Sequence, residues 1–401
     1  MAKGIVQTSI NSTTLPVRQT KSGYLPSLDG WRAIAIAAVM IHHDAWTGNF
    51  SLQAFKIRTA WGLELFFAIS GFLICSRILG EEEKFATFKI ASFYIRRFFR
   101  IQPAACAYLG VVGLLMVGGV VMESPKFWIG ALFGYQNFLY NSHVSARENI
   151  RTLLTGHFWT LAVEEHFYIL ISATLFFFKR RRILVLASLW FSSVILNRLL
   201  VNVCHIDLAS RFRMTNVVLP YLLFAALAAA LLQNKKNLET VKAYLSPWIT
   251  VLITVLLVSL RTVNQPSGLF TTDTLDRSEK YIFYCFTLWI VSTVTHPRSL
   301  STRFLENRAI RYVGRLSYSL YLWHVLFFLP ARPEMGITWH PLVIMSSFPL
   351  RYLFTLIAAL VSYYVVERPM IRIGHRLADR FQLRSSSVSP QNALILKQGP
   401  T

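Results

Sequence analysis

Charged residues are scarce in this sequence, and acidic residues are the scarcest among them. Only 15% of the 401 residues are charged, with 19 acids against 41 bases, whereas 54% are hydrophobic. Soluble domains average about 25% charged residues, so the composition excludes an ordinary soluble domain and indicates a chain that lies largely in lipid. The four cysteines stand apart without CxxC spacing, and we interpret them as small buried hydrophobes rather than metal ligands.

The excess of basic residues does not point to a nucleic-acid partner. A net charge of +22 could attract phosphate backbones. The basic runs, such as Lys179 to Arg182, stand between long apolar segments, however, and this placement is typical of the loops of a membrane protein. We therefore expect membrane lipid, and no nucleic acid, among the partners.

Ten apolar segments are long enough to cross a membrane. They predict an all-α fold, a polytopic transmembrane helix bundle with spans at 30–47, 61–79, 103–122, 157–178, 183–202, 214–233, 246–262, 281–296, 312–330 and 345–366. A stretch from Phe127 to Tyr140 is short and broken by glycine, so it is expected to be re-entrant or interfacial. Twenty-six lysines and arginines then fall on one side of the membrane and 10 on the other. The positive-inside bias predicts a protein of the cytoplasmic (inner) membrane with both termini cytoplasmic.

The same segments predict the domain organisation. Residues 1–28 are polar and are expected to form a cytoplasmic tail, and residues 29–372 form the membrane domain. Residues 373–401 are expected to be a disordered cytoplasmic tail. Because no second soluble domain is visible in the sequence, any chemistry of this chain is expected in the membrane domain.

The first span, SLDGWRAIAIAAVMIHHDAW, places ionisable residues in an apolar helix. Such groups are costly in lipid and are functional candidates by default. Arg32 and His43 are eleven residues apart and share one helix face, whereas His42 is rotated from that face by about 100°. The alternative is an arginine that reaches the inner interface and a histidine pair at the outer one.

The second span, WGLELFFAISGFLI, carries Glu64 and Gly71 on one face. Gly71 permits close approach of another helix. Glu64 either orients a neighbouring histidine or pairs with an outer arginine such as Arg58. The sequence leaves both roles open.

The next motif, FYIRRFFRIQPA, brings three arginines close together before a span: Arg96, Arg97 and Arg100. Guanidinium groups bind phosphates through paired, charge-assisted hydrogen bonds, which suits a nucleotide-like ligand. An inner cluster of arginines is equally what anionic lipid and topology demand. Ligand binding and lipid anchoring therefore both remain open here.

The fourth span begins HFWTLAVEEHFYIL and places His157, Glu164 and Tyr168 on one face. The adjacent acids Glu164 and Glu165 would be expensive in a membrane helix unless they face a polar cavity. A helix that simply begins in the outer loop would explain the position of His157, but it would not explain two adjacent acids in the span. The segment therefore predicts a polar interior.

The last two motifs add a polar face and a helix end. The ninth span, VGRLSYSLYLWHVLF, carries four polar residues on or beside one face, namely Ser317, Tyr318, Tyr321 and His324. The tenth ends in YYVVERPMIR, where Glu367 and Arg368 are interpreted as an inner ion pair and Pro369 as a helix breaker.

Taken in order, these segments resemble the acyltransferase-3 family. Its patterns read LDGLRAxAxxxVxxxH, GVDLFFVxSGFLI, FxxRRxxRIxP, WSLxVEEQFY, SYxxYLxH and ExP, and the resemblance extends from Ser27 to about Arg372. The sequence departs from the patterns where Glu64 stands for the usual Asp, Thr160 for Ser and His166 for Gln.

The resemblance implies an acyltransferase. Its expected reaction moves an acyl group, usually acetyl, from cytosolic acyl-CoA to a hydroxyl group. The acceptor is a cell-surface or secreted carbohydrate or a lipid-linked glycan. No permanently bound cofactor and no metal are expected. The implied catalytic residues are His43, Glu64 and Glu164. The donor would bind at Arg32, Arg96, Arg97 and Arg100, and the substrate at His157, Tyr318, Tyr321 and His324. His43 could act as a general base or as a nucleophile. A membrane transporter or glycan flippase is the alternative from another class.

Overall fold

The computed structural model describes residues 24–44, 61–139, 152–204, 213–263, 272–328 and 339–384, with side chains left out at 257–282 and 382–384. All regular structure in these ranges is helical, so the all-α class is confirmed. Of the two predicted tails, residues 1–23 and 385–401 lie outside the described residues. The division into tails and a membrane domain stays a prediction.

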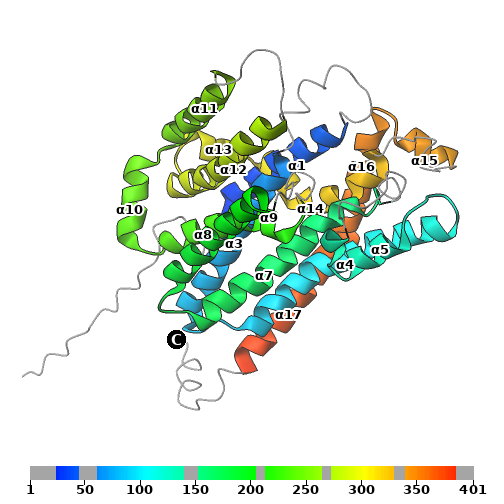
Figure 1. Ribbon diagram of the computed structural model, residues 1–401. Coiled ribbons are helices and arrows are strands. Elements are labelled where there is room, and N and C mark those ends of the chain that lie inside the picture. The colour runs from blue at the N-terminus through cyan, green and yellow to red at the C-terminus, as the bar shows by residue number, and fades with distance from the viewer. Residues whose placement is uncertain are drawn as a thin grey trace, which may run out of the picture.

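The helices form a bundle (Figure 1). The first half of the chain forms α1 (Pro26–Asp44), α3 (Gly62–Phe85), α4 (Ile90–Val117), α5 (Pro125–Leu132), α7 (Trp159–Phe177), α8 (Arg182–Asn202) and α9 (Thr215–Leu231). The second half forms α10 (Lys235–Tyr244), α11 (Pro247–Val263), α12 (Thr272–Thr295), α13 (Leu300–Leu305), α14 (Arg308–Phe328), α15 (His340–Met345), α16 (Leu350–Val361) and α17 (Arg368–Arg384). Short 3-10 turns lie at η3 (Gln136–Phe138) and η4 (Gly156–Phe158), and a π-helical turn lies at η6 (Ser362–Glu367). Segments far apart in the sequence lie side by side in the bundle, such as α1 and α14, α3 and α9, and α4 and α17.

Several helices have the length and apolar composition of membrane spans. Five described segments meet both conditions: Gly62–Phe85, Ile90–Val117, Gly156–Phe177, Arg182–Asn202 and Leu350–Phe381. A sixth exists if α9 and α10 count as one span, although the pair bends by 110°. The chain is thus a helical membrane protein. The segment predicted to be re-entrant or interfacial contains only the eight-residue α5 and the turn η3, which are too short to span.

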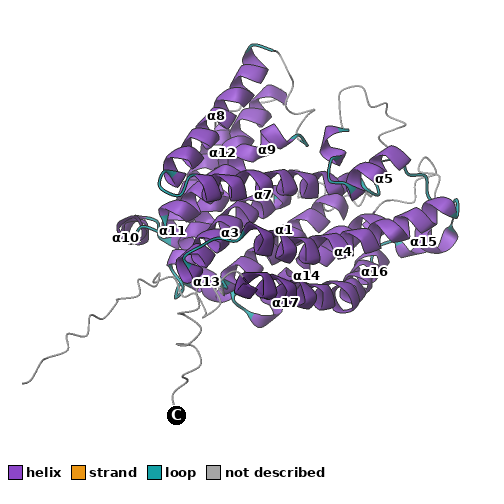
Figure 2. Ribbon diagram, turned by 90° about the horizontal axis from the view of Figure 1, so that it is seen from below, coloured by secondary structure: helices purple, strands orange, loops and turns teal. Residues whose placement is uncertain are grey.

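Helix α1 lies inside the bundle and packs against α14 and α3 (Figure 2). Glycines allow these close contacts. A Cβ atom on Gly314 of α14 would lie 1.8 Å from the carbonyl oxygen of Asp29, and one on Gly30 would lie 2.4 Å from that of Leu305. At Gly71 the distance to the carbonyl oxygen of Leu222 on α9 would be 2.4 Å, which confirms the predicted close approach of a helix there.

Gly314→Ala is expected to destabilise the fold, because the added methyl group would overlap the Asp29 backbone. Overpacking of this kind costs about 1–3 kcal/mol. Gly110→Ala is the matched control, since α4 leaves open space around that position. Thermal unfolding of both purified variants in detergent measures the difference. Equal melting temperatures for the two variants would contradict the close contact of α1 with α14.

The C-terminal part of the chain corrects one interpretation of the sequence. Pro369 does not end its helix, because α16 passes through the π turn Ser362–Glu367 directly into α17. The π turn provides a wider coil just before the residue that lacks an N–H group. Glu367 also has a different partner from the one expected: its carboxylate accepts a hydrogen bond from Ser319 of α14, while Arg368 lies over the ring of Tyr364. Helix α17 continues past the predicted domain boundary at 372.

Helix α17 packs along α4, as Figures 1 and 2 both show. Its inward face is made of small residues, since a Cβ on Gly374 would meet the Phe99 side chain and Ala378 is fully buried. The opposite face carries four exposed arginines at intervals of four residues, Arg368, Arg372, Arg376 and Arg380.

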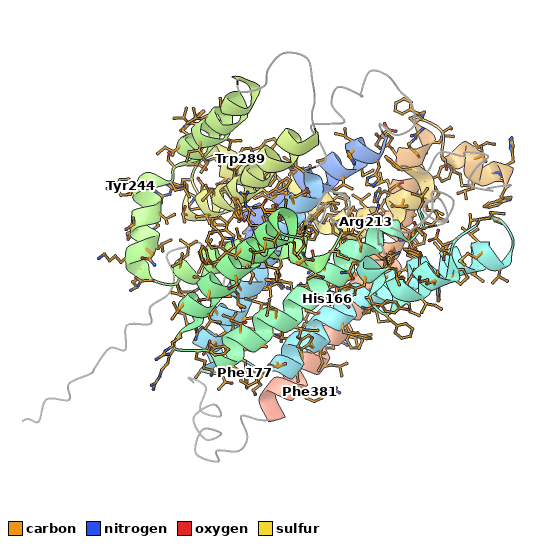
Figure 3. All side chains as sticks on the ribbon, in the orientation of Figure 1. His166, Phe177, Arg213, Tyr244, Trp289 and Phe381 are labelled. Carbon is orange, nitrogen blue, oxygen red and sulfur yellow. The ribbon has the colours of Figure 1, made fainter. Side chains whose placement is uncertain are left out.

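The outer surface of the bundle is apolar. Phe177 at the end of α7 and Phe381 on α17 have exposed fractions of 73% and 52%, and both project from the bundle in Figure 3. Helix α8 exposes Leu184, Phe191 and Leu199 in the same way. Large exposed apolar side chains on long helices are expected where lipid covers the surface.

Candidate active site

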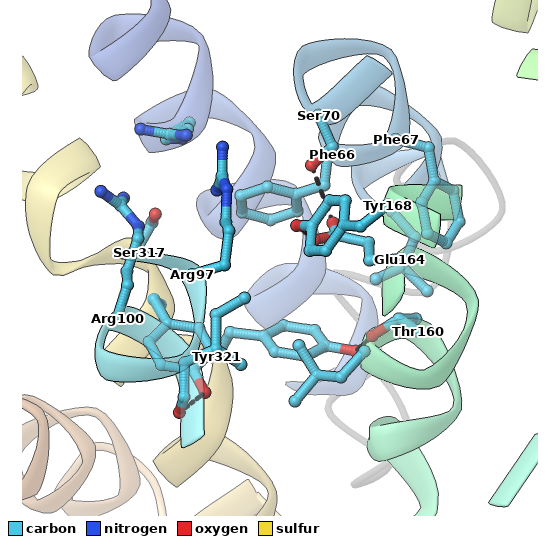
Figure 4. A pocket seen from close by; sticks show the side chains of 15 residues that line it. Phe66, Phe67, Ser70, Arg97, Arg100, Thr160, Glu164, Tyr168, Ser317 and Tyr321 are labelled. Atoms are coloured by element: carbon cyan, nitrogen blue, oxygen red, sulfur yellow. Dashed lines mark hydrogen bonds between the residues drawn. The ribbon is translucent and has the colours of Figure 1, made fainter. Parts of the chain in front are cut away.

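A cavity of about 90 Å³ lies between five helices, α1, α3, α4, α7 and α14 (Figure 4). Its lining is mixed. The apolar part comes mainly from Leu63, Phe66, Phe67, Ile101 and Leu161, and the polar part from Arg32, Ser70, Arg97, Arg100, Thr160, Glu164, Tyr168, Ser317, Tyr318 and Tyr321. Six residues that the sequence predicted for the site therefore meet at one cavity: Arg32, Arg97, Arg100, Glu164, Tyr318 and Tyr321.

Basic side chains dominate the charge of this cavity. Arg97 and Arg100, about one turn apart on α4, line it (Figure 4). Arg32 lines it from α1. Arg32 forms an ion pair with Asp29 at 3.4 Å. The Arg97 guanidinium lies over the Tyr168 ring, 5.2 Å from its centroid, a favourable cation–π geometry. Within the described residues no ion pair is formed by Arg97 or Arg100. Such a cavity favours an anionic ligand.

Arg96 does not reach the cavity. Its guanidinium forms an ion pair with Glu81 of α3. Helix geometry alone does not exclude Arg96, because Arg96 and Arg100 are four residues apart and lie on one broad face with Arg97. The contact with Glu81 is what holds the Arg96 side chain away from the cavity. The structure thus separates the three arginines that the sequence had grouped.

Glu164 belongs to the cavity wall. Its carboxylate accepts hydrogen bonds from Ser70 at 2.8 Å and from Tyr168 at 2.5 Å. The bond to Tyr168 confirms the shared helix face predicted for these two residues. Ser70 was missed by the sequence analysis, although it stands directly before Gly71 in the segment SGFLI. The catalytic role predicted for Glu164 stays a prediction.

Tyr321 forms the boundary between the cavity and a cluster of histidines. Its hydroxyl lies 2.8 Å from the Thr160 hydroxyl and donates to the backbone carbonyl of His157 at 2.9 Å. Its ring centroid lies 5.4 Å from that of His157 and 5.6 Å from that of His324. Tyr318, three residues before Tyr321 on α14, also lines the cavity. Its hydroxyl donates to the Ile101 carbonyl at 2.7 Å and joins α14 to α4.

Three histidines from distant parts of the chain meet beyond Tyr321. The ring centroids of His43 and His324 are 4.8 Å apart, and those of His157 and His324 are 5.9 Å apart. In His43 the Nδ1 atom lies 2.8 Å from the Val39 carbonyl oxygen, and in His324 it lies 2.7 Å from that of Tyr321. A carbonyl oxygen only accepts, so each Nδ1 carries a hydrogen and each Nε2 carries a lone pair. The described residues contain no group of side chains arranged to hold a metal ion.

The residue after His43 fixes the end of α1. Asp44 is fully buried, and its carboxylate pairs with Arg351 at 2.7 Å and accepts a hydrogen bond from the Tyr352 hydroxyl at 2.8 Å. These contacts join α1 to α16. The sequence offered a signal, since HHD ends an apolar helix with an acid, but nothing in it identified Arg351 as the partner.

Glu64 lies half-buried in the first turn of α3, and its predicted catalytic role stays a prediction.

A second buried carboxylate, Glu123, holds the segment that leads to His157. Its oxygens accept hydrogen bonds from the backbone N–H groups of Leu154 and Thr155, at 3.1 and 3.3 Å, and from the Thr155 hydroxyl at 2.6 Å. Tyr108 donates to the Leu154 carbonyl at 2.7 Å. Sequence analysis missed Glu123, because a single acid in a loop has no periodic pattern around it.

Glu123 gives the protein a pH-dependent stability outside the apolar spans. Burial raises the pKa of Glu123 from 4.5 to about 8 in the folded protein. Folding therefore favours the protonated form, so the stabilising contribution is present below pH 4.5 and is lost as the pH rises through about 8. A tenfold difference in proton affinity corresponds to about 1.4 kcal/mol.

We expect the melting temperature to fall more steeply between pH 5 and pH 8 in the wild type than in Glu123→Gln, which cannot ionise. Thermal unfolding across this range measures both slopes, and Glu83→Gln at an exposed position is the control. Parallel slopes in the wild type and Glu123→Gln would refute the prediction.

A helical bundle with membrane-length apolar helices and a polar interior cavity defines an integral membrane protein with an internal site. Residues 25–368 match the model of the acyltransferase-3 family, described as an acyltransferase domain. The chain belongs to this family, and its class is that of the acyltransferases.

Two relatives from Staphylococcus aureus are named as O-acetyltransferases. A protein of Staphylococcus aureus (strain COL) named as a candidate O-acetyltransferase is 30% identical over 387 residues, which cover 91% of this chain and 60% of that protein. The O-acetyltransferase OatA of Staphylococcus aureus (strain MRSA252) is 28% identical over 391 residues, 93% of this chain and 61% of OatA. The chain therefore spans about three fifths of the length of these relatives. No solved structure matches.

Proposed function

We propose that this protein is a membrane O-acyltransferase that moves an acetyl group from cytosolic acetyl-CoA to a hydroxyl of a cell-surface or secreted carbohydrate or lipid-linked glycan. The family and the relatives named O-acetyltransferase support O-acetyl transfer. The observation that carries the proposal is the arrangement of an arginine-lined cavity on one side of Tyr321 and a histidine cluster on the other.

The arginine cavity suits the acyl donor. Coenzyme A carries phosphates, and the guanidinium groups of Arg97 and Arg100 can bind them through charge-assisted hydrogen bonds. Arg32 adds a third positive charge from α1. In this arrangement the phosphates bind between α4 and α1, and the acyl arm extends past Ser317 and Tyr318 toward Tyr321. Arg96 supports α4 through Glu81 rather than binding the donor.

The histidine cluster suits the transfer step. The Nδ1 atom of His43 lies 2.8 Å from the Val39 carbonyl oxygen, to which it donates in the neutral ring, and Nε2 is then the nitrogen that takes the proton. As the acceptor oxygen attacks the thioester carbon, its proton passes to Nε2 of His43. The C–S bond then breaks, its electrons stay on sulfur, and the thiolate of coenzyme A finally takes the proton. A positioned general base contributes about 10²–10⁴-fold to such a step.

The proposed topology follows the distribution of charge in the sequence. Ten spans plus the interfacial segment around α5 place both termini and the arginine end of α4 in the cytoplasm, where coenzyme A is found. The histidine cluster then lies toward the outer side of the inner membrane, from which a secreted carbohydrate is reached. The acceptor would contact His157 and Tyr321 in this proposal.

Vesicles of defined orientation test this function. Radiolabelled acetyl-CoA is added outside inside-out or right-side-out membrane vesicles that contain the protein and envelope polysaccharide. Base-labile label in the polysaccharide of inside-out vesicles alone is the expected result, and an inactive His43→Ala protein is the control. Polysaccharide that crosses the membrane without acquiring label would instead establish the transporter.

A further inference from the structure

Arg77 of α3 is a basic residue that the sequence analysis did not single out. It stands seven residues, two helical turns, after Ser70 and therefore on the same face of α3. Ser70 lines the arginine cavity and Arg77 does not. The helical rise places Arg77 about 10 Å farther along α3 than Ser70. Arg77 thus lies beyond the cavity, toward the end of α3 at Phe85.

An ion pair relates the position of Arg77 to helix α4. Glu81, one turn after Arg77 on α3, pairs with Arg96 of α4. On α4, Arg97 and Arg100 follow Arg96 in the direction of the cavity, which both of them line. Arg77 and these two arginines therefore lie between the ion pair and the cavity. The charged groups that act most strongly on Arg77 are Arg97 and Arg100, and both are positive.

The described residues do not neutralise this group of arginines. Glu81 and Glu82, the acids near the end of α3, already pair with other basic residues. In the part of the chain that the structure describes, the side chains of Arg77, Arg97 and Arg100 form no hydrogen bond and no ion pair. All three are half-buried, and like charges in such a position are costly unless an anion binds among them. The arrangement favours a ligand with more than one negatively charged group.

Coenzyme A carries its phosphates in two places. A diphosphate joins the pantetheine arm to the adenosine, and a phosphate monoester lies on the 3′ oxygen of the ribose, remote from the thioester. In the proposed donor site Arg97 and Arg100 bind phosphate while the acyl arm extends into the cavity. The 3′-phosphate then lies beyond these two arginines on the side away from the acyl group, where Arg77 stands. A phosphate monoester carries about 1.5–2 negative charges near neutral pH and accepts paired hydrogen bonds from a guanidinium.

We propose that Arg77 binds the 3′-phosphate of the acyl donor and thereby selects coenzyme A thioesters over thioesters that lack this phosphate. This inference rests on the proposed function, which names acetyl-CoA as the donor. The headgroup of an anionic lipid offers a phosphate of the same chemistry, so the experiment must distinguish the two sources. Arg77 is a binding residue, since it is remote from the reacting atoms.

Binding of two non-transferable analogues measures the selectivity, one of acetyl-CoA and one of 3′-dephospho-acetyl-CoA. Wild-type protein in a phosphate-free maltoside detergent should bind the first about 10–100-fold more tightly, the effect of one charge-assisted contact. Arg77→Gln should bind the acetyl-CoA analogue about 10–100-fold more weakly than the wild type and the dephospho analogue within a few-fold. Arg96→Gln is the matched control and should keep the preference, because Arg96 pairs with Glu81.

Two further measurements distinguish this role from a structural one. Without ligand, Arg77→Gln removes a charge that Arg97 and Arg100 repel, so its melting temperature should equal or exceed that of the wild type. The loss of a structural contact would lower it. In turnover with acetyl-CoA, Arg77→Gln should raise KM and leave kcat within a few-fold. Arg77→Lys keeps the charge without the paired donors and should restore the preference only in part.

Added phosphatidylglycerol tests the lipid source. If this lipid raises the melting temperature of the wild type but not of Arg77→Gln, and the wild type binds both analogues equally, Arg77 anchors lipid and the inference is overturned. Equal weakening of both analogues in Arg77→Gln would also overturn it, because Arg77 would then add only general positive charge.

The wild type separates this inference from the proposed function. Tight binding of both analogues without preference would overturn the role of Arg77 while acetyl-CoA remains the donor. Binding of neither analogue would remove the donor itself, so that the proposed function fails together with the inference.

Discussion

His43→Ala should abolish acyl transfer while expression and acetyl-CoA binding remain close to wild type. His43 is the histidine whose ring contacts His324, and its Nε2 lone pair is oriented by the bond from Nδ1 to Val39. Removal of a general base lowers the rate by about 10²–10⁴-fold. Turnover of the purified variant with radiolabelled acetyl-CoA, together with its melting temperature, measures the effect.

His42→Ala is the matched control for His43. The two residues are adjacent, similarly exposed and equally long, but their directions differ by about 100° around α1. His42→Ala should retain much of the activity. An active His43→Ala enzyme would eliminate the proposed mechanism, and equal losses in both variants with equal falls in melting temperature would show that the pair only supports the helix end.

Arg97→Gln combined with Arg100→Gln should weaken acetyl-CoA binding strongly. Each arginine can supply a charge-assisted contact of about 1.5–3 kcal/mol, so the double variant is expected to bind about 10²–10⁴-fold more weakly. Lysine at both positions should restore binding only in part, because a point charge cannot reproduce the paired hydrogen bonds of a guanidinium. Titration calorimetry with a non-transferable acetyl-CoA analogue measures the affinity.

Arg96→Gln tests whether donor binding depends on the arginines that line the cavity or only on the total positive charge of the motif. Arg96 has the same side chain in the same motif, but it pairs with Glu81 instead of lining the cavity. It should therefore change affinity by no more than a few-fold, although it should lower the melting temperature slightly. Equal losses of affinity for Arg96→Gln and the double variant would indicate that the motif attracts anions only through its summed charge.

Local periodicity predicted much of what lies within single helices. The spacing of four between Glu164 and Tyr168 predicted a shared face, and the hydrogen bond between them confirms it. The sequence also indicated a polar interior from the acids of α7 and close packing at Gly71. These features depend on residues three to seven positions apart, a distance over which helix geometry is regular.

Contacts between helices could not be predicted in the same way. His43 and His324 lie 281 positions apart in the sequence, and no pattern within α1 or α14 identifies the other as its neighbour. The partners of Arg96 and Glu123 likewise come from other segments. Arg96 was grouped with Arg97 and Arg100 in the sequence, but in the structure it pairs with Glu81 of α3 and does not line the cavity, which no pattern within α4 could indicate.

The π turn between α16 and α17 determines the direction in which α17 faces. A π turn accommodates one residue more than an α turn, so it behaves as a single-residue insertion that the helix has absorbed. Deleting one residue between Ser362 and Val366 would rotate α17 by about 100° relative to α16. The close contact between Gly374 and Phe99 would be lost, and the row of exposed arginines would rotate toward α4. The single extra residue of the π turn therefore determines which face of α17 packs against α4.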